Sequence, residues 1–279
     1  MTIKSPTNEL LVEVKNGIAI ITLNRPDRLN AITEPLFGGI AQMCREISED
    51  ESIKVVIVTG AGSAFCAGAD IAGAGGHPAI NDYVGDEPIR EVLKGWSYER
   101  LVKPVGYEIF DIWNCIKPTI AMVNGVTAGA GMSIAAACDI RITSDNARFG
   151  LRFHAVGLIP DACGTYLIPR LIGYDKAFEL YCSDSVIDAQ EALRIGLVTK
   201  VVPDNQLVET TMNLAEKIAK GPSLAQILTK RGMREGLHNT FRTQLDYESY
   251  AQNYVRTTSD FKNAVLAFRD KQKPKFTGR

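Results

Sequence analysis

Hydrophobic residues occur in short apolar runs through the first two hundred residues and in helical stripes beyond them. Short apolar runs bounded by turn-forming residues are typical of buried strands. One pair of runs flanks Asn16-Gly17, which predicts a hairpin with a tight turn. The strands predicted in this way cover residues 10–14, 18–23, 55–58, 119–123, 139–143 and 198–202.

Helical patterns lie between and after these strands. Thr33 and Pro35 are a start signal for a helix that runs to about Glu51, and Asp188 with Glu191 has the form of a capping box. Further helices are predicted over residues 132–138, 166–171, 174–182, 205–220, 223–235 and 240–269, the last broken near residues 257–258. Because no strand interrupts the last three, we place a boundary near residue 203. It separates a core over residues 1–203 from a helical region over residues 204–279.

Two stretches of the chain, residues 60–69 and 125–131, carry mainly small side chains. The second lies between a predicted strand and a predicted helix. A bare backbone at the start of a helix presents N–H groups and the positive end of the helix dipole to whatever lies in front of it. The alternative is close packing of helix on sheet, which small residues also favour.

Residues 72–112 give a less regular pattern. A glycine-rich, acidic loop comes first and is predicted to be mobile. A helical pattern through Trp96, Leu101, Tyr107, Phe110 and Trp113 follows it, and we interpret this helix as a cover over a pocket.

Composition excludes several classes of function. The net charge of −1 gives no reason to expect nucleic acid or an anionic membrane as a partner. No apolar run is long enough to span a bilayer, and the first ten residues lack a hydrophobic signal core. The six cysteines contain no CxxC pair and the three histidines lack metal-ligand spacing, so we expect reduced thiols, no metal site and a cytoplasmic location.

Two familiar motifs match only in part. Gly60-Ala-Gly62 follows a strand as in a dinucleotide-binding loop, but Phe65 stands where a third glycine is needed. Gly131-Met-Ser133-Ile-Ala135 resembles a nucleophile elbow, yet its serine lies too far beyond the strand. A serine hydrolase would also need His154 or His238 as its base.

Asp161 lies between Pro160 and small residues in an otherwise apolar segment. A carboxylate there either caps the following helix or lies in an apolar pocket with a raised pKa suited to proton transfer. Sequence alone leaves both interpretations open. His154 likewise fits a hydrogen-bonded structural residue or a base.

Taken together, these stretches resemble the crotonase superfamily, the enoyl-CoA hydratase/isomerase proteins. The resemblance covers almost the whole chain and rests on the order and spacing of many segments. They are LNRPDRLNAIT, GSAFCAGADI, KPTIAMVNGVTAGAGMSIAAACDIRI, ARFG, VGLIPDACGT, DAQEALRIGLVTKVV and the helical tail.

The resemblance implies an α/β fold of stacked strand-strand-helix units, with a C-terminal helical region that packs in trimers or pairs of trimers. It implies a coenzyme A thioester as substrate and no permanently bound cofactor. The thioester carbonyl would be held by the backbone N–H groups of Ala69 and Ala130. The residues that it places at the CoA moiety are Arg28, Ala67, Asp70, Ile71, Lys271 and Lys273.

Departures from the family pattern bear on the reaction. Hydratases of this family use two glutamates, and this chain has Ser133 and Phe153 at the matching positions. Both fall in the expected acyl pocket, with Trp96 and Tyr98 suggesting room for a cyclic or aromatic group. Asp161 matches an aspartate of some isomerase branches.

We therefore favour proton shuttling by Asp161 that moves a double bond. Two alternatives remain. One is a hydratase whose water is held by Asp161 with Ser133 or His154. The other is a CoA-binding subunit without activity.

Overall fold

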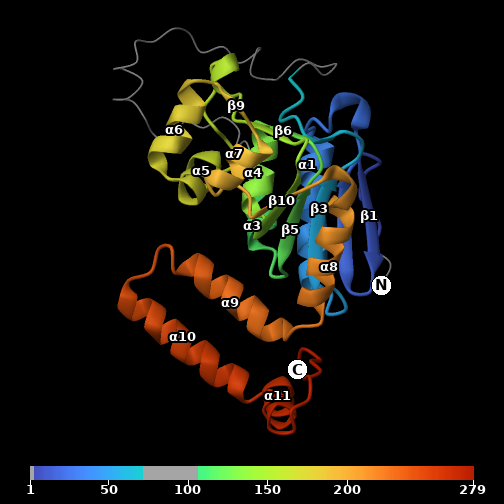
Figure 1. Ribbon diagram of the computed structural model, residues 1–279, viewed down its shortest axis with the longest axis vertical. Helices are drawn as coiled ribbons and strands as arrows, with labels where there is room; N and C mark the ends of the chain where they lie inside the picture. The colour runs from blue at the N-terminus through green and yellow to red at the C-terminus, as the bar shows by residue number, and fades with distance from the viewer. Residues whose placement is uncertain (1–2, 72–105) are drawn as a thin grey trace.

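A computed structural model describes residues 3–71 and 106–279 and shows two sheets that the chain visits alternately (Figure 1). The first sheet has the order β1 (Leu10–Lys15), β2 (Ile18–Leu23), β3 (Val55–Gly60), β5 (Thr119–Val123), β7 (Ile140–Ser144) and β10 (Lys200–Val202). The second has the order β4 (Ala64–Cys66), β6 (Val126–Ala128), β8 (Arg148–Gly150) and β9 (Val186–Asp188).

Strand pairing follows from this alternation. β1 pairs with β2 and β8 with β9 in antiparallel fashion, and all the other paired strands are parallel. Each of β3, β5 and β7 continues directly into a strand of the second sheet, as in a spiral of strand-strand-helix units. The predicted α/β fold of strand-strand-helix units is confirmed, and the packing of its C-terminal helices in trimers stays a prediction.

Local signals set where the elements begin and end. Asn16 and Gly17 both have positive φ, 53° and 77°, as the tight hairpin turn requires. The Thr33 hydroxyl accepts a hydrogen bond from the Leu36 N–H and caps α1 (Glu34–Glu49). Asp188 caps α7 (Ala189–Arg194) in the same way, with the Glu191 N–H as donor.

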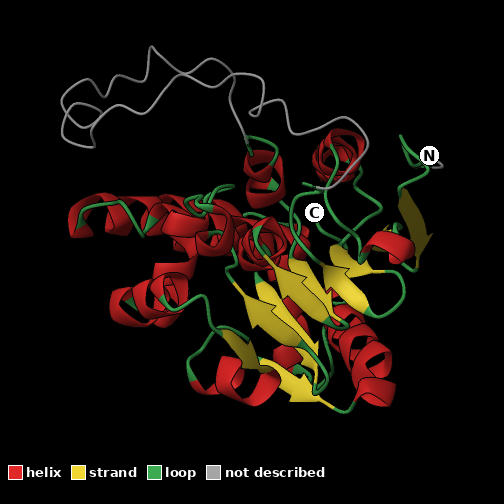
Figure 2. Ribbon diagram, turned by 90° about the horizontal axis from the view of Figure 1, so that it is seen from above, coloured by secondary structure: helices red, strands yellow, loops and turns green. Residues whose placement is uncertain are grey.

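The first sheet is covered by helices on both faces (Figure 2). Alternate residues of β3 point to opposite sides: Val56 and Val58 face the large core under α1, and Val55 and Ile57 face α8 (Leu207–Ala219). Within the described residues, the remaining helices of the core are α3 (Ile109–Asn114), α4 (Ala130–Ala137), α5 (Gly164–Ile172) and α6 (Tyr174–Cys182). Parallel strands buried on both faces explain the nearly continuous apolar runs in the sequence.

α8 packs on the core although it lies beyond the predicted boundary. Leu207 and Ala215 are fully buried with Ile18, Ile120 and Val202 of the first sheet. The helices that project from the core are α9 (Ser223–Glu235), α10 (Phe241–Arg256) and α11 (Ser259–Arg269), which we call the arm (Figure 1). The division after residue 203 stays a prediction, but the first helix beyond it covers the sheet.

The arm is docked through one positively charged face of α9 and the turn after it. Lys230 and Arg234 lie four residues apart and so share one side of α9, and His238 follows four residues later, in the turn after the helix. The Lys230 ammonium lies 2.7 Å from one carboxylate oxygen of Asp139, and the Arg234 guanidinium lies 2.6 Å from the other.

Aromatic rings complete this contact. The Arg234 guanidinium lies 3.8 Å from the centre of the Trp113 ring, a cation–π contact. His238 is hydrogen-bonded to the Tyr166 hydroxyl, and the two rings are stacked. Burial lowers the pKa of Arg234, and the Asp139 carboxylate opposes that effect.

The predicted mobile loop, and Trp96, Tyr98 and Leu101 of the predicted covering helix, lie outside the described residues. Of that pattern the structure describes α3, with Trp113 against the arm and Phe110 exposed. All six cysteines are free: Cys163 and Cys182 are exposed and the others buried. In residues 3–71 and 106–279 no His, Cys, Asp and Glu group is arranged to hold a metal, and no helix could cross a membrane.

We expect Asp139→Ala to lower the free energy of unfolding by about 2–4 kcal/mol, because it leaves the partly buried cations Lys230 and Arg234 without their carboxylate. Urea denaturation measures this. Asp246→Ala is the matched control: it breaks an ion pair with Arg242 in which both side chains are more than half exposed, and should cost at most about 0.5 kcal/mol. Equal losses of unfolding free energy in the two variants would contradict a larger contribution from the partly buried ion pairs of Asp139.

Candidate functional site

Residues 67–70 are held in place by the loop that follows β2. The Ala67 N–H donates to the Leu29 carbonyl at 3.0 Å, and the Ile32 N–H donates to the Gly68 carbonyl at 2.7 Å. The Asp70 N–H returns a bond to the Ile32 carbonyl at 2.9 Å. In such a bridge the intervening residue turns its own N–H away from the partner strand, so the Ala69 N–H faces the other side.

An ion pair of the Asp70 side chain also holds residues 67–70 in place. The Arg25 guanidinium lies 2.8 Å from an Asp70 carboxylate oxygen and 3.3 Å from one of Glu9. Arg25 also donates to the Ala31 carbonyl at 2.6 Å. Glu9 in turn is hydrogen-bonded to the Thr33 hydroxyl. Asp70, predicted as a CoA-binding residue, therefore ties its segment to β1 and to the start of α1.

Ala130 is the first residue of α4, whose eight residues are all buried. Its N–H belongs to the first turn, where backbone donors have no partner inside the helix. Gly129 before it has φ 52° and ψ −130°, a conformation that disfavours any residue with a Cβ atom. Glycine at this position therefore sets the direction in which the Ala130 N–H points.

The two segments touch through their backbones. Gly68 has φ 94°, and a methyl group on it would lie 3.0 Å from the Ala128 carbonyl oxygen and 3.4 Å from the Gly129 Cα. Among the hydrogen bonds of residues 3–71 and 106–279, neither the Ala69 nor the Ala130 N–H is a donor. Two neighbouring N–H groups without acceptors are suited to hold a negatively charged oxygen.

Three side chains were predicted for the acyl pocket and the chemistry: Ser133 lies in α4, and Phe153 and Asp161 belong to segments close to it. The Ser133 hydroxyl donates to the backbone carbonyl of Asp161 at 3.0 Å. Phe153 is buried, and its ring reaches to 4.0 Å from where a Gly129 methyl would be. One carboxylate oxygen of Asp161 is buried as well. The structure therefore brings Ala130, Ser133, Phe153 and Asp161 together.

Asp161 does not cap the helix that follows it, so that interpretation is wrong. The N-cap position of α5 is Cys163, which makes no side-chain cap bond. The backbone explains this, because Ala162 and Cys163 both adopt left-handed conformations, with φ 46° and 59°. That turn puts Cys163, and not Asp161, at the N-cap position of α5.

The alternative motifs are also excluded. The Gly60-to-Gly62 turn leads into β4, and a dinucleotide-binding loop would lead into a helix. Ser133 donates to a carbonyl, whereas His154 is exposed beside Tyr181 and His238 is bonded to Tyr166. Neither His154 nor His238, the two histidines that the structure describes, is therefore placed to activate Ser133.

Cys66 is also not suited to act as a nucleophile at this site. Cys66 lies under the start of α4, where a methyl on Gly131 would be 2.9 Å from its sulfur. Burial raises the pKa of the Cys66 thiol to about 12. The thiol is therefore neutral, and thiolate is the form that would attack a substrate.

The residues predicted to bind CoA fall into two groups. Arg28 is exposed in the 3-10 helix η1 (Pro26–Arg28), beside the segment with Ala67 and the half-exposed Ile71. Lys271 and Lys273 follow α11 in an exposed coil. Figure 1 places α11 at the far end of the chain from β6 and α4. One chain therefore does not bring the two lysines to residues 67–71.

Comparison with known proteins gives the class of this fold and site. Two alternating sheets with these helices are the crotonase fold: the structure of enoyl-CoA hydratase from Bacillus anthracis matches with a TM-score of 0.83 and 31% identity, over 98% of this chain and 100% of that one. A family model described as enoyl-CoA hydratase/isomerase matches residues 13–279. The chain belongs to this enzyme family.

Curated relatives carry two kinds of name. A 1,2-epoxyphenylacetyl-CoA isomerase from Escherichia coli K12 is 34% identical over 97% of this chain and 98% of its own length. A short-chain-enoyl-CoA hydratase from Clostridium acetobutylicum is 35% identical over 95% of this chain and 96% of its own length. The family thus includes isomerases and hydratases at similar distance, and the local chemistry must distinguish them.

We expect Gly68→Ala to lower kcat/KM by at least about tenfold, approaching the 10²–10³-fold of a lost oxyanion donor, because the methyl would displace the Ala69 N–H from that of Ala130. Steady-state kinetics on a CoA thioester measures this. Gly157→Ala is the matched control, since Gly157 also has positive φ, 70°, but open space around it. Wild-type kinetics for Gly68→Ala would contradict a shared donor site.

Proposed function

We propose that this protein isomerises the double bond of an unsaturated acyl-CoA thioester. The thioester carbonyl would accept hydrogen bonds from the N–H groups of Ala69 and Ala130, and Asp161 would move the proton. The observation that carries this proposal is the backbone contact between Gly68 and Gly129. This contact supports the proposal because it joins the segments that carry the two N–H groups, and neither group donates a hydrogen bond within the described residues. Ser133, on the same helix as Ala130, donates to the backbone carbonyl of Asp161.

The chemistry follows from enolate formation. Asp161 as a carboxylate removes a proton from a carbon next to the double bond, and the electrons move to the thioester oxygen. The two N–H groups stabilise this oxygen as its negative charge develops. Protonated Asp161 then returns the proton to a different carbon, so the double bond shifts and no atom is gained or lost. One residue serves as base and acid in turn.

Isomerisation is favoured over hydration by what surrounds Asp161. Hydration needs a group that activates water, and the matching family positions here carry Ser133 and Phe153. The Ser133 hydroxyl is engaged with the Asp161 carbonyl, and exposed His154 packs against Tyr181. The relative named as an epoxyphenylacetyl-CoA isomerase supports this choice, whereas the relatives named as hydratases support the alternative.

CoA itself would lie along the loop of Arg28 and the segment from Ala67 to Ile71. Arg28 is exposed and makes no ion pair within the described residues, so it is available for a phosphate. Asp70 would contribute by holding this segment through Arg25. Lys271 and Lys273 could reach CoA only on a neighbouring copy, because the arm holds them far from residues 67–71 of their own chain.

We expect Asp161→Asn to lower kcat by about 10²–10⁴-fold, because the amide keeps the shape but loses the titrating proton. Affinity for CoA, measured by calorimetry, should stay near wild type, since the ground-state thioester is held elsewhere. A 3-enoyl-CoA in deuterated water should shift its double bond, whereas hydration would add one water to its mass. Turnover of Asp161→Asn at the wild-type rate would remove the acid from the proposal. CoA binding without turnover of any acyl-CoA would point to a non-catalytic subunit.

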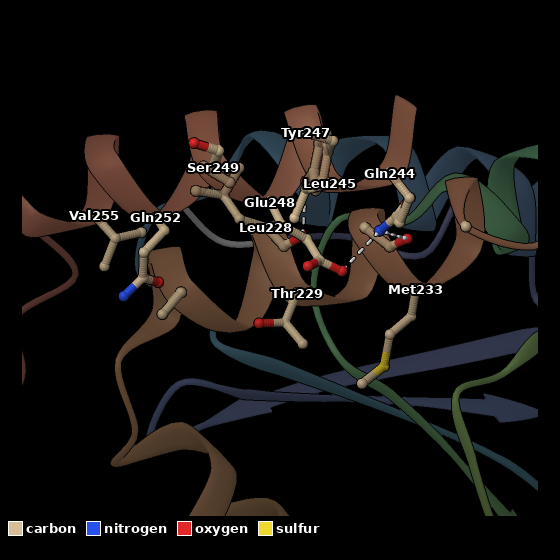
Figure 3. Close-up of a pocket in the computed structure, with 14 residues that line it drawn as sticks. Leu228, Thr229, Met233, Gln244, Leu245, Tyr247, Glu248, Ser249, Gln252 and Val255 are labelled. Atoms are coloured by element: carbon tan, nitrogen blue, oxygen red, sulfur yellow. Dashed lines mark hydrogen bonds between the residues drawn. The ribbon is translucent and has the colours of Figure 1, made fainter. Parts of the chain in front are cut away.

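We also propose that the arm joins copies of the chain into a trimer or a pair of trimers. Its helices expose large apolar side chains: Phe241 and Phe268 are each 87% exposed. A groove of about 680 Å³ runs between α9 and α10, with Met233 and Leu245 along it (Figure 3). Apolar surface of this kind on a projecting arm is typical of contacts between subunits.

Light scattering should give a mass that is three times the 30.4 kDa of one chain, or a multiple of that. Met233→Lys should weaken the assembly, because it introduces a charge into the groove between α9 and α10. Val208→Lys is the matched control on the exposed side of α8, where the valine is 60% exposed, and should leave the mass unchanged. A wild-type monomer at micromolar concentration would contradict the proposal.

A further inference from the structure

The turn that carries Asp161 is conformationally costly. Ala162 and Cys163 are consecutive residues with side chains, and both lie in the left-handed region. Such residues persist only where the surroundings hold them, and they concentrate at functional sites. The turn is packed from one side by Gly106, on which a methyl would lie 2.9 Å from the Ala162 nitrogen. Its orientation therefore depends on neighbours outside the turn.

Ser133 is one such neighbour. It is 1% exposed, and its hydroxyl donates to the Asp161 carbonyl at 3.0 Å, across 28 residues of sequence. A serine inside a helix commonly bonds to the carbonyl four residues before it. Ser133 instead bonds to a different element, at the residue that begins the left-handed turn. The Gly164 N–H donates to the same carbonyl at 2.7 Å.

The position of Ser133 in the helix gives this bond a second consequence. Ser133 lies three residues after Ala130, so both face nearly the same side of α4. α4 is buried along its whole length and packs against β4 and α5. One rigid helix therefore carries a proposed oxyanion donor at its start and, one turn later, the hydroxyl that holds the Asp161 backbone.

We infer that Ser133 is a positioning residue for Asp161, which fixes the left-handed turn and so the distance between the proton-transferring carboxylate and the oxyanion hole. This inference rests on the proposed acid–base role of Asp161. It differs from a role in the acyl pocket, in which Ser133 would contact the substrate. Here the hydroxyl acts through the backbone, and the substrate does not touch it.

We expect Ser133→Ala to lower kcat by between about 10-fold and about 10²-fold with KM little changed, because the carboxylate is displaced and substrate binding is not affected. Ser133→Cys keeps a weak hydrogen-bond donor, so its kcat should lie between those of the wild type and Ser133→Ala. Ser48→Ala is the matched control. The Ser48 hydroxyl also links two elements, donating to the Cys44 carbonyl and accepting from the Ile116 N–H, far from Asp161 in the sequence.

A second substitution separates the two roles. Cys163→Gly removes the left-handed penalty at the exposed one of the two residues, so the turn should depend less on Ser133. Ser133→Ala with Cys163→Gly should therefore regain part of the lost kcat, while Cys163→Gly alone stays near wild type. If the double variant is as slow as Ser133→Ala, the hydroxyl acts on the substrate and the inference is overturned.

A double-mutant cycle distinguishes failure of this inference from failure of the proposed function. If Ser133 acts through Asp161, adding Ser133→Ala to Asp161→Asn should slow the residual reaction no further. A further loss of the size seen in the wild-type background would overturn the positioning role while leaving Asp161 as the acid and base. A fast Asp161→Asn protein would instead overturn the proposed function. Circular dichroism tests whether each variant is folded. If Ser133→Ala does not fold, Ser133→Cys replaces it in the cycle.

Discussion

Contact between two stretches of bare backbone is the constraint on which the rest of the site depends. Gly68 and the Ala128–Gly129 segment lie so close that neither glycine could carry a side chain without strain. β4 and β6 bring them together, with Cys66 opposite Thr127, and the second sheet is only a few residues wide at this point. In the proposed oxyanion hole, no side chain would therefore stand between the N–H groups of Ala69 and Ala130 and a bound oxygen. Side-chain donors would have had to be held in position at an entropic cost.

Features governed by neighbouring residues could be predicted from the sequence. The hairpin at Asn16-Gly17, the caps at Thr33 and Asp188 and the break near residue 257 depend on a few adjacent positions, and the structure has each of them. The bare segments were predictable for the same reason. Their meeting was not, since it depends on how the strands of the second sheet pair.

Features that depend on distant contacts escaped prediction. Asp161 looks like a helix cap locally, but a left-handed turn at Ala162 and Cys163 moves it out of that position, and neither residue type announces such a turn. Asp70 stays a predicted CoA-binding residue, but its ion pair with Arg25, 45 residues away in the sequence, could not be predicted. α8 has the composition of the arm, yet packs on the sheet because its apolar stripe matches the outer face of β3 and β5.

The way in which α9 meets the core fixes its position along its own axis. An apolar helix face can slide by one turn and still find apolar partners. Lys230 and Arg234 cannot both keep their partner, because a slide by one turn would take one of the two cations away from Asp139 and leave it partly buried without a carboxylate. The ion pairs of Lys230 and Arg234 with Asp139 therefore fix one position of α9 along its axis. Since the helix and its following turn also meet α3 and α5 through Trp113 and Tyr166, the place at which the arm leaves the core is set by charge geometry.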